Sequence, residues 1–163
     1  MNARPAIAAD AGAICAIYNA GIAERVATFE TEPRTPEQIM AWLGGVHPTV
    51  VVEDGAAVVA FASTSAYRSR ACYVGVAEFS VYVAPAARGR GAGRLAMEAL
   101  LQAAEKAGFW KLVSRVFVEN EASRSLLRSQ GFREVGVYEK HGQLDGRWRD
   151  VVIVEKLLAC AED

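Results

Sequence analysis

The chain has 163 residues, of which 52% are hydrophobic and 23% charged, a composition typical of one ordinary globular domain. Its formal net charge of −1 argues against a general affinity for nucleic acid or for an acidic membrane. No apolar run is long enough to span a bilayer, and no signal peptide is evident. The three cysteines and two histidines are scattered, which argues against a disulfide framework or a metal site. We therefore expect a cytoplasmic protein without a metal.

The amino-terminal part of the chain predicts one short strand and two helices. The strand covers residues 4–7, and the first helix begins at Asp10 and ends near Glu24, because apolar residues recur there at helical spacing. Residues 26–35 show no period and predict a loop. Residues 35–38 then read Thr-Pro-Glu-Gln, a capping box with proline in the first turn, and predict a second helix that runs to the glycine pair at 44–45.

The remaining elements follow as a hairpin, a long strand and alternating helices and strands. The hairpin turns at Asp54-Gly55, and the long strand covers residues 73–83. The other predicted elements are a helix at 91–108, a strand at 110–118, a helix at 119–131, and strands at 132–138 and 149–157, the last two connected by residues 141–147. The order βααβββαβαββ predicts an α/β or α+β fold in which one sheet has helices on both faces.

A glycine-rich turn directly follows the long strand, in the sequence Arg-Gly-Arg-Gly-Ala-Gly-Arg at residues 88–94. Glycines allow close approach of a ligand to the backbone, and the start of the next helix favours an anion. No Gly-Lys-Ser/Thr triplet is present, which excludes a P-loop, and Arg94 stands where the dinucleotide fingerprint requires its third glycine. The alternative is a tight turn with solvated arginines.

The pattern Arg/Gln-x-x-Gly-x-Gly/Ala, formed by Arg88, Gly91 and Gly93, resembles the GCN5-related N-acetyltransferase (GNAT) family. A second signature begins at Asn120, which could otherwise be an ordinary helix cap. The resemblance implies a mixed, mostly antiparallel sheet of six to seven strands flanked by about four helices, and acetyl-CoA as co-substrate. It assigns acetyl-CoA binding to Val81, Tyr82, Val83, Arg88, Gly89, Arg90, Gly91, Ala92, Gly93, Arg94, Asn120 and Ser123.

Three longer segments narrow the resemblance to the phosphinothricin acetyltransferase branch: residues 28–35, 81–94 and 146–158. Residues 118–148 look most similar to its arsinothricin N-acetyltransferase members, which are associated with arsenic resistance. The branch implies acetylation of the α-amine of an anionic amino-acid analogue, and a homodimer. Methionine sulfoximine or sulfone, or a peptide N-terminus, are alternative acceptors, and a non-catalytic acetyl-CoA sensor is an alternative of another class.

The branch implies that Glu78 is the general base that deprotonates the amine, directly or through water. The alternative is a strand carboxylate paired with a nearby arginine. A tyrosine that serves some family members as acid is replaced here by Leu127, so Tyr138 or an unprotonated thiolate remains open. Where some relatives have a supporting histidine, this chain has Asp145, and His141 is four residues away.

For the acceptor, Arg68 and Arg70 would point the same way in an extended segment and could bind two anionic groups. The branch implies that Arg70 and Tyr73 contact the substrate and that Phe29 and Glu30 form a wall. A solvated loop is the alternative for the arginines.

Overall fold

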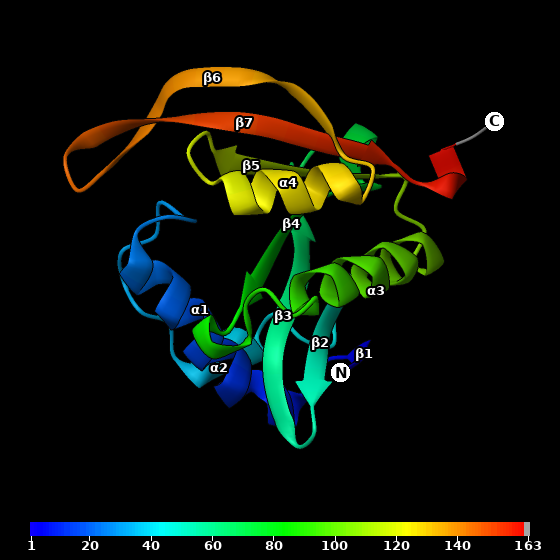
Figure 1. Ribbon diagram of the computed structural model, residues 1–163. Coiled ribbons are helices and arrows are strands. Elements are labelled where there is room, and N and C mark those ends of the chain that lie inside the picture. The colour runs from blue at the N-terminus through cyan, green and yellow to red at the C-terminus, as the bar shows by residue number, and fades with distance from the viewer. Residues whose placement is uncertain (162–163) are drawn as a thin grey trace.

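The computed structural model describes residues 1–161, which fold around a seven-stranded sheet with the order β1-β2-β3-β4-β5-β7-β6 (Figure 1). The strands are β1 Asn2–Pro5, β2 Thr49–Asp54, β3 Ala57–Ala66, β4 Val76–Val83, β5 Lys111–Phe117, β6 Arg133–Leu144 and β7 Arg147–Leu157. The helices are α1 Ala11–Glu24, α2 Pro36–Met40, α3 Ala92–Lys106 and α4 Glu121–Ser129. All strand pairs are antiparallel except β4–β5, as expected for a right-handed β-α-β crossover through α3. The predicted fold class and element order are confirmed.

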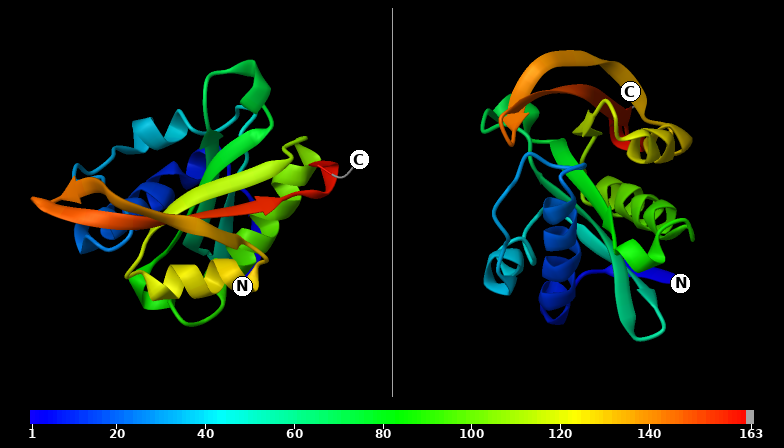
Figure 2. Two further views of the ribbon diagram at one scale, coloured as in Figure 1. Left: turned by 90° about the horizontal axis from the view of Figure 1, so that it is seen from above. Right: turned by 60° about the vertical axis from the view of Figure 1, so that its left-hand side comes forward.

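The helices cover both faces of the sheet (Figure 2). Successive strand residues point to opposite faces, so Val50 and Val52 of β2 join the cluster under α3, whereas Val51 packs in the cluster under α1 and α2. The two clusters bury the sheet on both sides. Within residues 1–161, no helix combines the length and apolarity that a membrane crossing requires.

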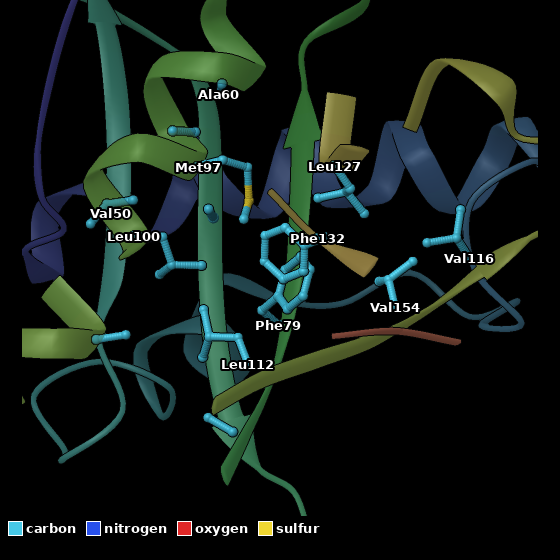
Figure 3. Packing of buried hydrophobic residues seen from close by; sticks show 14 of the residues in the cluster. Val50, Ala60, Phe79, Met97, Leu100, Leu112, Val116, Leu127, Phe132 and Val154 are labelled. Carbon is cyan, nitrogen blue, oxygen red and sulfur yellow. The ribbon is translucent and has the colours of Figure 1, made fainter. Parts of the chain in front are cut away.

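The larger cluster connects α3 to the middle of the sheet. Met97 and Leu100 of α3 point toward Phe79 of β4 and Leu112 of β5, and the ring of Phe79 lies 4.8 Å from that of Phe132 (Figure 3). These side chains are almost fully buried. Phe79 therefore anchors the middle of β4 to α3 and to Phe132 on one face of the sheet, which fixes the strand that carries the candidate site.

The predicted helix ends agree with the structure in part. Thr35 accepts a hydrogen bond from the Gln38 backbone N–H, and the Gln38 side chain accepts one from the Thr35 N–H, which completes the predicted capping box. The helix ends sooner than predicted, at Met40. Asp10 stands at the start of α1, but its carboxylate accepts from the Ile7 N–H and from Arg4 instead of capping α1.

Three further predicted segments differ from the structure. The first strand covers Asn2–Pro5 and not residues 4–7. Residues 71–73 form a short 3₁₀ turn, so β4 begins at Val76 and not at residue 73. Residues 141–147, predicted as a connection, mostly continue β6 and β7 up to a two-residue turn at Asp145-Gly146, where both residues have positive φ. The hairpin is therefore longer than predicted, and Figure 1 shows it extending across one end of the molecule.

Candidate active site

Strands β4 and β5 separate part-way along their length. They are paired only from Val76 to Glu78 on β4 and from Lys111 to Val113 on β5. At the point of separation the Ser114 hydroxyl donates a hydrogen bond of 2.9 Å to the Phe79 carbonyl. The rest of β4, through Val83, has no β5 partner along that edge, and this opening is where the cavities of the molecule lie.

The larger cavity has a volume of about 530 Å³ and lies between β4, β5 and the starts of α3 and α4. All twelve residues predicted to bind acetyl-CoA, except Arg90, contribute to its walls. Residues from the end of α1, including Gly21 and Glu24, close another side. The geometry thus brings together segments that lie almost a hundred positions apart in the chain.

The glycine-rich turn forms one wall of this cavity. Gly89 and Gly91 have φ values of 73° and 88°, which side chains with a Cβ rarely adopt. Gly91 is also the N-cap of α3, so the first N–H groups of a 15-residue helix face this turn. A Cβ on Gly93 would lie 3.1 Å from Leu126, so its absence allows α3 to pack close to α4.

Each arginine of the turn forms an ion pair with a carboxylate. Arg88 makes two hydrogen bonds to Glu24, Arg90 contacts Asp54 at 2.8 Å, and Arg94 contacts Glu98 at 2.8 Å. The Arg88 guanidinium lowers the pKa of Glu24 below its usual value. An anion in the cavity would therefore rely on backbone N–H groups first, and on the arginines only where they exchange partners.

The start of α4 contributes Asn120 and Ser123 to the same cavity. The Asn120 side chain accepts a hydrogen bond of 3.2 Å from the Ser123 N–H, so it also caps the helix. Leu127 is buried and reaches the cavity wall. Tyr138 is 53% exposed on β6, contacts the His141 ring, and lines neither cavity.

A second cavity of about 260 Å³ adjoins the first and shares six wall residues with it. Glu78, Phe29 and Glu30 line this second cavity. The Phe29 ring packs edge-on against Phe117 with centroids 4.8 Å apart. The predicted base and the predicted acceptor wall therefore lie together, next to the larger cavity.

Glu78 is 30% exposed, and its Oε1 lies 3.3 Å from Nη2 of Arg115. Arg115 lines both cavities. The sequence left open that Glu78 pairs with a nearby arginine, and this ion pair is present. It leaves the Glu78 carboxylate in the wall of the second cavity, next to an arginine that lines both cavities.

Tyr82 also lines both cavities but is held by packing. Its ring stacks on Phe61 at 5.5 Å and packs on Gly21, where a Cβ would come within 2.8 Å of the ring. Burial raises the pKa of the Tyr82 hydroxyl, so the side chain is neutral at physiological pH.

Arg68, Arg70 and Tyr73 line neither cavity. The guanidinium of Arg68 lies over the ring of Tyr67 at 4.8 Å. The Tyr73 ring contacts the Tyr67 ring edge-on. All three predicted acceptor contacts are exposed at the surface. Within one copy of the chain, the structure does not bring them to the site.

A model of the acetyltransferase (GNAT) family matches residues 16–132. The chain belongs to this family. The resemblance drawn from the glycine-rich turn and from Asn120 is thereby confirmed, and the protein is an N-acetyltransferase of the GNAT type.

Two curated GNAT relatives are similar over nearly their whole length. The chain is 34% identical to the phosphinothricin N-acetyltransferase of Streptomyces coelicolor, over 97% of this chain and 96% of the relative. It is 31% identical to the L-methionine sulfoximine/L-methionine sulfone acetyltransferase of Salmonella typhimurium, over 95% and 93%.

Two solved GNAT structures share the fold closely. A ribosomal-protein-alanine N-acetyltransferase from Brucella melitensis superposes with a TM-score of 0.92 at 34% identity, covering 97% of this chain and 100% of that one. A phosphinothricin acetyltransferase from Sinorhizobium meliloti in complex with acetyl-CoA superposes with a TM-score of 0.88 at 30% identity, covering 96% and 88%.

Sequence reasoning about this GNAT site missed Arg115 and Thr28, which both line the second cavity. Residues 110–118 read as a buried strand, yet Ser114 and Arg115 are polar residues within it. Arg115 interrupts the apolar residues in the middle of this strand, whereas the other charged residue, Lys111, lies at its start, and this interruption was the signal that could have identified Arg115. Thr28 lies in the irregular loop after α1, where no periodic pattern indicates direction.

Proposed function

We propose that this protein transfers an acetyl group from acetyl-CoA to the α-amine of a small anionic amino-acid analogue of the phosphinothricin type. The observation that carries the proposal is the meeting of two cavities where β4 and β5 separate, one beside the glycine-rich turn and the other beside Glu78. The acetyl donors and acceptors named for the relatives support this choice.

The larger cavity suits the donor. The turn at residues 88–94 can surround a pyrophosphate with backbone N–H groups, because Gly89 and Gly91 adopt positive φ and α3 begins there. Asn120 and Ser123, at the start of α4, would contact the pantetheine arm along the opposite wall. Bound acetyl-CoA supplies the acetyl group as an activated thioester.

The free edge of β4 can polarise the thioester carbonyl. The Phe79 carbonyl points toward β5, because it accepts the Ser114 hydroxyl. The N–H and carbonyl of one strand residue point to the same edge, and every second residue repeats that direction. The N–H groups of Val81 and Val83 therefore face the opening, where they can donate to an oxygen that gains negative charge.

Glu78 is the proposed general base. An ammonium cannot attack a carbonyl until it loses a proton, and a carboxylate in the wall of the smaller cavity can accept that proton directly or through a water molecule. Glu78 lines the smaller cavity and lies at the last paired position of β4, so an amine bound there faces the larger cavity.

Arsinothricin is the further acceptor of this type that we propose, and methionine sulfoximine and methionine sulfone are alternative amino-acid acceptors. Each compound has a free α-amine, an α-carboxylate and a short polar side chain. Molecules of this size suit a cavity of about 260 Å³. A peptide N-terminus is the competing acceptor. It is favoured by one structural neighbour, which is named as a ribosomal-protein-alanine N-acetyltransferase.

A thiol-release assay with acetyl-CoA tests the proposal against its alternatives. We expect release of free CoA with phosphinothricin, arsinothricin or methionine sulfone, and none with a ribosomal-protein peptide. Turnover of the peptide alone would establish the protein acceptor. Tight acetyl-CoA binding without turnover of any amine would establish a sensor and refute the proposal.

We further propose that the protein is a cytoplasmic homodimer. Cys15 and Cys72 are free thiols, as expected in a reducing compartment. Exposed apolar side chains gather on the β6–β7 hairpin, which ends the sheet: Val135, Val137, Tyr138 and Trp148 are each at least 45% exposed. Light scattering of the wild-type protein should give a molar mass twice that of one chain. The Val137→Glu variant should give the mass of a single chain. A monomeric wild-type protein at micromolar concentration would refute the dimer.

A further inference from the structure

Three residues that line the smaller cavity carry a charge: Glu30, Glu78 and Arg115. Arg115 is thus the cation of this cavity, and its side chain is 50% exposed, so its guanidinium is accessible. It lies on β5 just beyond Val113, the last residue paired with β4. The strand that separates from β4 therefore carries a positive charge into the opening.

The guanidinium of Arg115 is only partly engaged. Its Nη2 lies 3.3 Å from Oε1 of Glu78, and no other ion pair of Arg115 occurs among residues 1–161. A guanidinium has five N–H donors in a planar fork that matches a carboxylate. Arg115 can therefore contact a second anionic group while it stays next to Glu78.

The spacing of groups in an α-amino acid fits this pair. The amine and the α-carboxylate are bound to the same carbon, so an amine that reaches Glu78 brings its carboxylate to within a few ångströms of the same place. Glu78 and Arg115 offer opposite charges across 3.3 Å. An amino acid can thus present its ammonium to the carboxylate and its carboxylate to the guanidinium.

We propose that Arg115 binds the α-carboxylate of the acceptor and makes the enzyme selective for free α-amino acids over peptide N-termini. In a peptide the corresponding group is a neutral amide, which cannot neutralise the guanidinium. The inference rests on the proposed function and deepens it, because it assigns the feature that distinguishes the two competing classes of acceptor.

Arg68 and Arg70, the arginines that the sequence favoured, do not compete for this role within one chain, because both are exposed and line neither cavity. Charge-assisted hydrogen bonds to a carboxylate are stronger than neutral ones. Loss of the Arg115 contact should therefore lower kcat/KM for an amino acid by roughly 10- to 100-fold.

The test compares methionine sulfone and phosphinothricin with their α-carboxamides, in the wild-type enzyme and in Arg115→Gln. The wild-type enzyme should prefer the acids, and Arg115→Gln should lose that preference through a higher KM for the acid. The KM for acetyl-CoA should stay within about twofold. Arg115→Lys, which keeps the charge without the planar fork, should retain part of the preference.

Arg128→Gln is the matched control, because Arg128 is also exposed and pairs with Glu121 and Glu134 but lines neither cavity. It should leave the ratio of acid to amide unchanged. If Arg115→Gln folds, turns over and keeps the wild-type ratio, Arg115 does not bind the carboxylate, while the proposed function stands. If the wild-type enzyme acetylates neither the acids nor the amides, the proposed function itself fails.

Discussion

At the scale of single residues, Glu78 has a fixed backbone and an accessible side chain. It occupies the last paired position of β4, which holds its backbone, and its side chain reaches the smaller cavity beside Arg115. A base at such a position is rigid at one end and accessible at the other, as proton transfer requires.

Glu78→Gln removes the proposed proton acceptor and keeps the size of the side chain. We expect kcat at neutral pH to fall roughly 100-fold or more, with a much smaller change in the KM for acetyl-CoA. The loss should shrink as the pH rises, because the solution then supplies more of the acceptor as free amine.

Steady-state kinetics over a range of pH check this prediction, with Glu98→Gln as control, since Glu98 pairs with Arg94 and lines neither cavity. Full wild-type kcat in Glu78→Gln would show that another group or bulk water removes the proton.

At the scale of elements, the turn before α3 depends on Gly91. Its φ of 88° costs an alanine about 1–2 kcal/mol, because Cβ then approaches the following carbonyl. We expect Gly91→Ala to raise the Kd for acetyl-CoA, measured by calorimetry, more than it raises the KM for the amine. Gly45→Ala is the control, because its Cβ meets nothing within 4 Å at an ordinary φ. Equal affinity in both variants would argue against the turn as the donor site.

Gly142 of β6 packs against Phe29, which lines the smaller cavity that we propose for the acceptor. A Cβ on Gly142 would lie 2.9 Å from Cε1 of the Phe29 ring, so Gly142→Ala must displace that ring. Because Phe29 lines the cavity, we expect a higher KM for the acceptor, largest for bulky side chains, and an unchanged KM for acetyl-CoA. Phe29→Leu in the same chain should restore part of the loss.

Gly136→Ala, on the same strand with no neighbour within 4 Å, should behave as the wild-type enzyme. A uniform loss across acceptors of every size in Gly142→Ala would show a general disturbance of the hairpin and not a change in cavity size.

At the scale of the whole molecule, ion pairs connect segments that are distant in sequence. Arg4 of β1 contacts Asp10 before α1 and Glu53 of β2, while Glu155 of β7 contacts Lys111 and Arg133. The cationic partners lower the pKa of Asp10, Glu134 and Glu155 below their usual values. The unfolded chain therefore binds protons at a higher pH than the folded one.

A lowered carboxyl pKa stabilises the fold above the unfolded value near 4, and this contribution is lost as the pH falls through the folded value. Asp10→Asn should thus lower the free energy of unfolding at pH 7 by about 1–3 kcal/mol, because the buried carboxylate accepts from Arg4 and from the Ile7 N–H. Urea titrations at pH 7 and pH 3 should show the difference narrowing in acid. A difference independent of pH would contradict the assignment.

The sequence was informative where the physics is local. The capping box at Thr35 depends on a few neighbouring residues, and the structure has it. The hairpin predicted at Asp54-Gly55 is also present but shifted by one residue, because Asp54 pairs with Ala57 and residues 55 and 56 form the turn. The glycine-rich turn is likewise a local pattern, and it forms one wall of the larger cavity.

The rest depends on tertiary contacts that no local pattern encodes. Where β4 and β5 separate is decided by packing on both faces of the sheet, so Arg115 could not be placed from its strand alone. The prediction that Arg68 and Arg70 point together assumed an extended segment, but β3 ends at Ala66 and the chain bends at residues 67, 69 and 70. Asp145-Gly146 has the composition of a two-residue hairpin turn. The strands were predicted to end at residue 138 and to begin again at residue 149, so the hairpin was not predicted to continue to this turn.

The six wall residues common to both cavities have a kinetic meaning. Because the two cavities adjoin, we expect the acetyl group to pass directly from a donor in one to an acceptor in the other, with no side chain that carries it. Both substrates must then be present together before either product forms. Acetyl exchange between acetyl-CoA and free CoA should not occur without an amine, because no acetylated enzyme forms that could react with the CoA.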